Sequence, residues 1–136
     1  MANTIDISPE LTRKVSCAQL YPQIESLLGS ETNLTANLSN FCAALKQTLE
    51  IFWVGFYLVE GNELVLGPFQ GNVACTRIGF GKGVCGAAWK EKQTYIIPNV
   101  EAFEGHIACS SQTRSEIVIP IMKKESVVAV LDVDSN

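Results

Sequence analysis

The spacing of the apolar residues changes near residue 51, from a helical period to the alternation of a strand. Before that point apolar side chains recur every three or four residues, which predicts a helix over about residues 9–28 and a second one that ends near residue 49. Over residues 52–58 they occupy both sets of alternating positions, which is typical of a strand with two buried faces. Helices followed by strands predict an α+β domain, with a central antiparallel sheet, helices packed on one face and a ligand pocket on the other.

Local signals mark where these elements begin and end. Ser8 followed by Pro9 is typical of a helix start, and Asn33 or Thr35 can cap the second helix. Residues 98–115 form a loop longer than most connections in a compact domain, which indicates a functional segment. The remaining predicted elements are a turn at Glu60-Gly61-Asn62, a strand near 76–80, a short helix near 84–92, a strand near 94–97, and a hairpin of 116–122 with 126–132.

The composition excludes several classes of partner. At 136 residues, of which 47% are hydrophobic, the chain fits one globular domain. Its net charge of −4 disfavours binding to nucleic acid or to an anionic membrane. No apolar stretch approaches the roughly 18–20 residues that span a bilayer, and the N-terminus lacks the basic and apolar segments of a secretory signal. We therefore expect a cytoplasmic protein.

Five cysteines are many for a chain of this length, and their odd number excludes complete internal pairing. In a reducing cytosol persistent disulfides are rare, so each cysteine is a buried apolar residue, a metal ligand or a redox-active thiol. Cys17 and Cys42 lie on the predicted helices, where packing is the favoured interpretation. Cys75, Cys85 and Cys109 lie in or beside loops of the β half, where distant thiols can meet a small molecule and one another.

Metal binding by these three cysteines and nucleotide binding by the nearby glycines are both disfavoured. The three cysteines form no C-x-x-C motif, and His106 with Cys109 is an isolated ligand pair, so we expect no metal and no cofactor. The glycines of residues 79–83 match neither a P-loop nor a dinucleotide fingerprint and indicate a tight turn. Redox chemistry fits better, because a helix start and Lys82 beside Cys85, and His106 beside Cys109, all favour a thiolate.

Three carboxylates form a second group of candidates. Asp132 and Asp134 are two residues apart on a strand, so they leave the sheet on the same face. If the last hairpin turns at residues 123–125, Glu116 lies on the neighbouring strand end and the three acids converge. Such crowding raises at least one pKa and provides a proton donor near neutral pH. Solvated strand ends are an equally good interpretation of the two aspartates taken alone.

Two aromatic residues lie on the same face of the first predicted strand. Trp53 and Tyr57 project from it on either side of Gly55. Their rings could wall an apolar pocket, and packing in the core explains them equally well.

Six motifs, in their order and with this cysteine spacing, resemble those of the free methionine-(R)-sulfoxide reductases, which are built on a GAF domain. The resemblance implies a single GAF domain over residues 1–136. It also implies thiol-dependent reduction of free methionine-(R)-sulfoxide to methionine. The motifs are W-V-G-F-Y-L at 53–58, L-G-P-F-Q-G at 66–71, G-K-G-V-C-G at 81–86, G-H-I-A-C at 105–109, R-S-E-I-V-I-P at 114–120 and V-L-D-V-D-S at 130–135.

The resemblance implies roles for the cysteines. Cys109 corresponds to the nucleophile that attacks the sulfoxide sulfur and becomes a sulfenic acid. Cys75 and Cys85 correspond to thiols that resolve the sulfenic acid through disulfides, with the main partner left open, and thioredoxin-type reductants restore the thiols. A sulfenic acid is reversible only while a thiol captures it, so a second cysteine is required.

The same resemblance implies roles for the acidic and aromatic residues. Glu116, Asp132 and Asp134 correspond to residues that hold the substrate's ammonium group or protonate the sulfoxide oxygen. Trp53 and Tyr57 correspond to residues that line the pocket around the methyl-sulfur end of the substrate.

Other features lie outside the shared roles. Backbone N–H groups of residues 105–115, with Arg114, are our hypothesis for the site that binds the substrate's carboxylate. Ser110 follows the G-H-I-A-C motif, where the family commonly has aspartate. Members of the family commonly continue past the last motif into a C-terminal helix, whereas this sequence stops at Asn136, so we expect a domain without that helix. A homodimer is an open alternative to a monomer. The competing interpretations are a GAF module that senses a small molecule without catalysis, and a thiol redox sensor without a small substrate.

Overall fold

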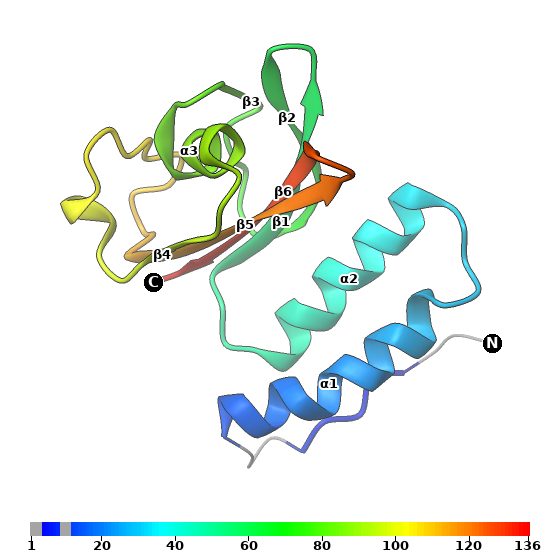
Figure 1. Cartoon of the computed structure of the whole chain (residues 1–136). Coiled ribbons are helices and arrows are strands. Elements are labelled where there is room, and N and C mark those ends of the chain that lie inside the picture. Colours follow the sequence, from blue (N-terminus) through cyan, green and yellow to red (C-terminus); the bar gives the residue numbers. More distant parts are fainter. Residues whose placement is uncertain (1–3, 9–11) are drawn as a thin grey trace.

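The computed structural model describes residues 4–8 and 12–136. Figure 1 shows two N-terminal helices packed beside a sheet that the rest of the chain builds. None of the described helices is long and apolar enough to cross a membrane. The helices are α1 (Arg13–Leu28), α2 (Leu34–Thr48), α3 (Gly83–Glu91) and the short 3-10 helix η1 (Val100–Ala102). The strands are β1 (Trp53–Glu60), β2 (Glu63–Gln70), β3 (Arg77–Gly79), β4 (Tyr95–Ile97), β5 (Ser115–Lys123) and β6 (Ser126–Ser135).

The first two helices begin at residues that can cap them. The helix α2 follows Asn33, whose side-chain oxygen accepts a hydrogen bond from the backbone N–H of Ala36 at 2.9 Å, as one of the two predicted caps would. The helix α1 begins later than predicted, after Thr12. The predicted start at Pro9 lies outside the described residues.

The six strands form one antiparallel sheet in the order β3-β2-β1-β6-β5-β4. The hairpins β1–β2 and β5–β6 are joined at the centre of the sheet by the pairing of β1 with β6. Their turns lie at residues 61–62 and 124–125, where the turn residues predicted them. The predicted α+β architecture is therefore confirmed.

The alternation of β1 divides its side chains between two apolar clusters. Val54 and Phe56 pack with Cys42 of α2, which confirms that this cysteine is buried in the core. Trp53 and Tyr57 face the other way and belong to a cluster that includes residues of α3. The short helix α3 thus lies opposite α1 and α2, on the face where the sequence predicted the pocket.

The ladder between β5 and β6 is irregular between Ile121 and Met122. Beyond this bulge, Val127 packs with the α3-side cluster, whereas Leu131 packs with the α2-side cluster. The simple alternation of β6 predicts one shared face for these two residues, and that prediction is wrong because the bulge shifts the alternation by one residue. The bulge lies between Asp132 and the turn of the hairpin, so it does not change the face on which the acidic residues lie.

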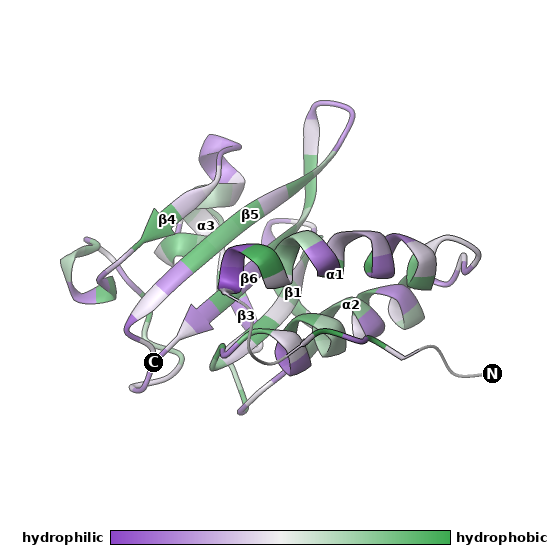
Figure 2. Cartoon of the chain, turned by 90° about the horizontal axis from the view of Figure 1, so that it is seen from below, coloured by the Kyte–Doolittle hydropathy of each residue, from purple (hydrophilic) through white to green (hydrophobic). Residues whose placement is uncertain are grey.

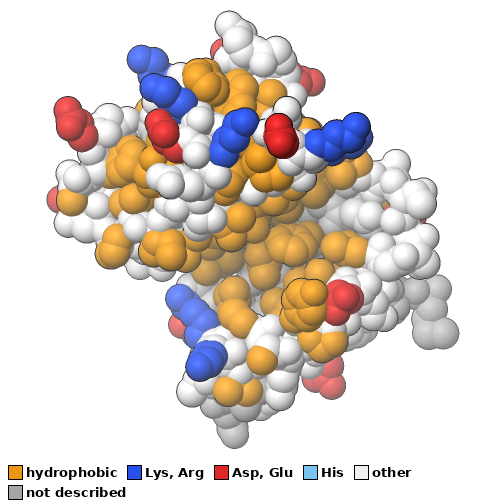
Figure 3. Space-filling view, viewed as in Figure 1, with side chains coloured by type: hydrophobic (Ala, Val, Ile, Leu, Met, Phe, Trp, Pro, Cys, Tyr) orange, Lys and Arg blue, Asp and Glu red, His pale blue; other side chains and the backbone are white. Residues whose placement is uncertain are grey.

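A strip of apolar side chains is exposed on β5. Ile117, Ile119 and Ile121 are each 36–38% exposed and lie on the face that carries α2. Figure 2 shows β5 as hydrophobic along much of its length, and Figure 3 shows apolar side chains gathered in a hollow between the sheet and the helices. The helix α2 packs on β1 and β2, so the described residues cover the β1–β2 half of this face more fully than the β5 half.

Candidate active site

A narrow cavity lies between the sheet and α3. Its walls come from β1, residues 72–74, the start of α3, residues 106–113, β5 and β6. The cavity volume is about 40 Å³, and the cavity is partly open to solvent. The predicted cysteines, acids and aromatic residues all line this cavity except Cys75, which is bonded to one of them.

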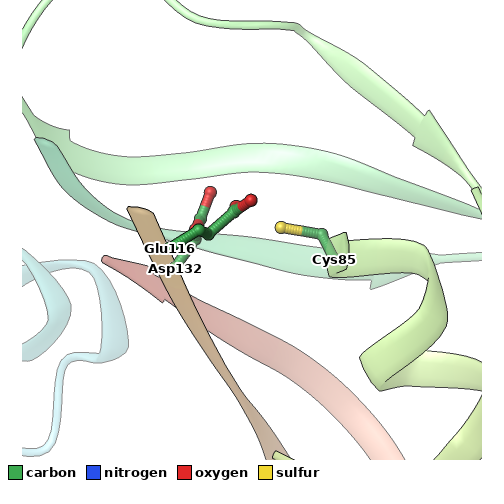
Figure 4. Close-up of side chains that lie close together, drawn as sticks. All are labelled: Cys85, Glu116 and Asp132. Carbon is green, nitrogen blue, oxygen red and sulfur yellow. The ribbon is translucent and has the colours of Figure 1, made fainter. Parts of the chain in front are cut away.

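Three carboxylates converge in the cavity, as the strand pattern predicted. Glu116 on β5 pairs in register with Asp134 on β6, and Asp132 lies on the same face two residues before it. Glu116 is 8% exposed and Asp132 is 6% exposed, so these acids are buried rather than solvated. Figure 4 shows that the carboxylates of Glu116 and Asp132 lie side by side and face Cys85. Oδ1 of Asp132 and Oδ1 of Asp134 are buried with no hydrogen-bond partner among the described residues.

The environment of the two aspartates favours their protonated forms. Burial, followed by the charge of Glu116, raises the pKa of Asp134 to about 8. Burial, followed by the interaction with the Glu116 carboxyl, raises the pKa of Asp132 well above its usual range. Because the acids interact this closely, they titrate as a set. The site therefore holds at least one carboxylic acid that can donate a proton at neutral pH.

Cys85 lies in the first turn of α3 and is only 4% exposed. Burial, and then the charges of Asp132 and Glu116, raise the pKa of this thiol well above its usual range. The prediction that Cys85 is a thiolate is therefore wrong, because its neighbours in the fold outweigh the helix start and the exposed Lys82. Cys85 is a protonated thiol that faces the acid cluster.

Cys75 and Cys109 form a disulfide, with their Cα atoms 5.3 Å apart and 34 residues between them in sequence. Cys109 comes from the long loop before β5, and Cys75 comes from the connection between β2 and β3. Cys17, Cys42 and Cys85 are free thiols. Cys17 is exposed on α1, so the prediction that it packs in the core is wrong. The pairing identifies Cys75 as the direct partner of Cys109, a choice that the sequence left open.

The two aromatic residues of β1 hold the segment that carries Cys75. The Tyr57 hydroxyl donates a hydrogen bond to the backbone carbonyl of Cys75 at 2.8 Å, and Nε1 of Trp53 donates one to the carbonyl of Asn72 at 3.0 Å. Both rings also line the cavity, so they wall the pocket and belong to the core at once. Gly55 between them has to be glycine, because a methyl group there would overlap the Trp53 ring.

His106 lies beside the acid cluster. Its Nε2 lies 3.6 Å from Oε1 of Glu116, and both side chains are largely buried. Arg114, proposed for the substrate's carboxylate, is exposed and does not line the cavity, and its Nη1 donates to the carbonyl of Ser111 at 2.9 Å. Sequence reasoning also missed Thr113, a buried residue of the cavity wall that no motif signalled.

Comparisons with known proteins relate this chain to one group. The GAF domain family matches residues 33–136. The chain is 55% identical to "GAF domain-containing protein A" of Dictyostelium discoideum, over 100% of this chain and 86% of that protein. It is 47% identical to the free methionine-R-sulfoxide reductase of Escherichia coli, over 88% of this chain and 73% of that protein. The solved structure of free methionine-R-sulfoxide reductase from Neisseria meningitidis in complex with its substrate is 47% identical, with a TM-score of 0.94, and the match covers 98% of this chain and 81% of that chain.

Proposed function

The chain belongs to the GAF-domain free methionine-R-sulfoxide reductases, and we propose from its site that it reduces free methionine-(R)-sulfoxide to methionine with electrons from its own thiols. One observation carries this proposal. A cysteine that forms a disulfide and a buried cluster of acids with raised pKa values share one cavity. Neither a thiol nor a carboxylic acid is sufficient alone, because sulfoxide oxygen is a poor leaving group until it is protonated.

The proposed reaction consists of oxygen transfer, disulfide formation and reduction of the disulfide. The sulfur of Cys109 attacks the substrate, and a carboxylic acid of the cluster, for which Asp134 is suited, protonates the sulfoxide oxygen. The oxygen passes to Cys109, which becomes a sulfenic acid, and methionine is released. The thiol of Cys75 then attacks the sulfenic sulfur, which forms the Cys75–Cys109 disulfide and releases water. An external dithiol reduces this disulfide and completes the cycle.

The remaining contacts hold a free amino acid in the cavity. An ionised carboxylate of the acid cluster binds the ammonium group of the substrate, and this role is supported by the position of Glu116 and Asp132 in the cavity wall. Trp53 and Tyr57 contact its methyl-sulfur end. Backbone N–H groups of residues 105–115 bind its carboxylate without Arg114, which lies outside the cavity.

The proposal also includes the reductant and the cellular compartment. A thioredoxin-type protein reduces the disulfide, in a cytoplasmic setting where disulfides of this kind are transient. Residues 1–136 act as a single GAF domain, and two copies can associate as a homodimer.

The test of this function is stereochemical. The protein is incubated with dithiothreitol and each sulfoxide epimer of free methionine, and methionine is measured by chromatography. We expect methionine from the R epimer only, and little product from a peptide whose methionine sulfoxide has blocked termini. If the R epimer yields no methionine, the proposed activity is wrong and a binding module without catalysis is the better interpretation.

Replacing Cys75 by serine should separate the first turnover from recycling. Cys75→Ser still forms about one methionine per protein, because Cys109 is intact, but its steady-state rate with thioredoxin falls by about tenfold to 100-fold. The smaller loss is expected if Cys85 resolves the sulfenic acid slowly from its buried position. The matched control is Cys17→Ser on the exposed face of α1, which should behave like the wild type. A Cys75→Ser variant that recycles at the normal rate would exclude the observed disulfide from the cycle.

The pH dependence should report the acid cluster. The pKa of Asp134 is raised to about 8, so its proton is present below that pH and lost above it. We therefore expect single-turnover rates to fall as pH rises through about 8, by up to about tenfold per pH unit. The measurement uses protein reduced in advance and freed of reductant, so that the titration of dithiothreitol does not contribute. A rate that stays level to about pH 10 would show that no acid of raised pKa takes part.

A further inference from the structure

The cavity also gathers a set of metal-binding side chains. One ligand atom from each of Cys85, Glu116 and Asp132 lies within 4.8 Å of the others, and all three residues are buried. Figure 4 shows the thiol facing the two carboxylates. His106 lies beside this group, with its Nε2 3.6 Å from Oε1 of Glu116. The three ligand residues come from α3, β5 and β6, so no sequence motif brings them together.

The polar atoms of this site are not all satisfied within the described residues. The contact between His106 and Glu116 is the only one there that these carboxylates make with a basic side chain. Asp132 is 6% exposed, and its Oδ1 has no hydrogen-bond partner in the described part of the chain. Oδ1 of the neighbouring Asp134 is also buried and has no hydrogen-bond partner among the described residues. Unpaired carboxylate oxygens that are buried and line a cavity favour a bound cation.

We propose that Cys85, Asp132 and Glu116 bind a divalent cation of the zinc class. The combination of sulfur and oxygen donors selects this class over Mg²⁺ and Ca²⁺, which prefer oxygen ligands alone. In a tetrahedral zinc site neighbouring ligand atoms lie about 3.5 Å apart, so the side chains close in by about 1 Å when the ion binds. Cys85 binds as the thiolate, and its proton is released on coordination.

The cation acts as an inhibitor rather than as a cofactor. It occupies the acids that, in the proposed function, hold the substrate's ammonium group and protonate its oxygen. The inhibition rests on the proposed function, whereas the binding of the ion does not.

The binding test uses the protein in its disulfide form, because Cys75 and Cys109 then cannot act as ligands. Zn²⁺ affinity is measured by competition with a chromogenic chelator, and Co²⁺ is added separately to detect the thiolate-to-cobalt absorption band. We expect one ion per chain and a clear band. Cys85→Ser should remove the band, and both Cys85→Ser and Asp132→Asn should weaken Zn²⁺ binding by about 100-fold. The control Cys17→Ser should bind as the wild type does.

Defined outcomes would overturn the site. Binding that survives Cys85→Ser, or that is lost in Cys17→Ser, would place the ion elsewhere. If circular dichroism shows that Asp132→Asn is unfolded, the result for Cys85→Ser and its cobalt band decides between the two outcomes. In the activity arm, Zn²⁺ added to reduced protein should lower single-turnover methionine formation, and excess substrate should restore it. Zinc binding without any reductase activity would refute the proposed function alone, and reductase activity without zinc binding would refute this inference alone.

Discussion

Cys109→Ser is expected to abolish methionine formation, in the first turnover as well as in the steady state. Serine is nearly isosteric with cysteine, but its oxygen neither attacks a sulfoxide sulfur nor accepts the oxygen as a sulfenic acid. We expect the rate to fall by at least about 10³-fold. The measurement is methionine formed per protein after rapid quenching, with reduced protein in excess over the R epimer.

Two further variants make this result specific to one thiol. Cys17→Ser, on the exposed surface of α1, should keep the full single turnover. Cys85→Ser should also form methionine in the first turnover, since its thiol is held protonated beside the acid cluster. A normal burst of methionine from Cys109→Ser, together with none from Cys85→Ser, would transfer the nucleophile's role to Cys85. Thermal unfolding of each variant confirms that a lost activity is not a lost fold.

Asp134→Asn is expected to have opposite effects on activity and on stability. The amide cannot give a proton to the sulfoxide oxygen, so kcat/KM should fall by about 10²-fold to 10³-fold. The same change removes a carboxylate that is buried against Glu116 and Asp132, and it should raise the melting temperature at pH 8 by about 3–6 °C. Residues of an active site commonly reduce stability in this way.

The sign of the stability effect follows from the raised pKa. Between about pH 4 and pH 8 the folded protein holds a proton on Asp134 that the unfolded chain has released, so stability falls as pH rises through this window. The gain from Asp134→Asn should therefore be large at pH 8 and small at pH 5. Glu60→Gln, at the exposed end of β1, is the matched control and should change neither quantity. Wild-type kinetics with an unchanged melting temperature at pH 8 would show that Asp134 is neither an acid catalyst nor a source of strain.

The elements of this fold were largely predictable, because local periodicity and turn residues determine them. The alternation of β1 and the turn after Glu60 predicted the first hairpin, and Asn33 marked the start of α2. The side of the sheet on which α3 packs was not predictable, since it depends on the path of the chain after β3. The face of the sheet on which Val127 lies was predicted wrongly for a similar reason. A bulge is determined by the pairing of two strands and not by the pattern of one.

The acid cluster was predictable in position, whereas the state of the cysteines was not. Two aspartates on one strand face and a glutamate on the paired strand have to converge once the hairpin forms. The partner of Cys109 could not be chosen from sequence, because Cys75 and Cys85 both lie in the β half at loops or short elements. The protonation of Cys85 was predicted with the wrong sign, since the carboxylates that raise its pKa are distant in sequence.

The Cys75–Cys109 disulfide imposes an order on the catalytic cycle. While the two cysteines are bonded, Cys109 has no free thiol with which to attack a sulfoxide, and the protein offers its reductant a disulfide. Substrate and reductant therefore react with different redox forms of the protein, which is the basis of ping-pong kinetics. When reductant is scarce, the protein accumulates in a form that does not consume its substrate.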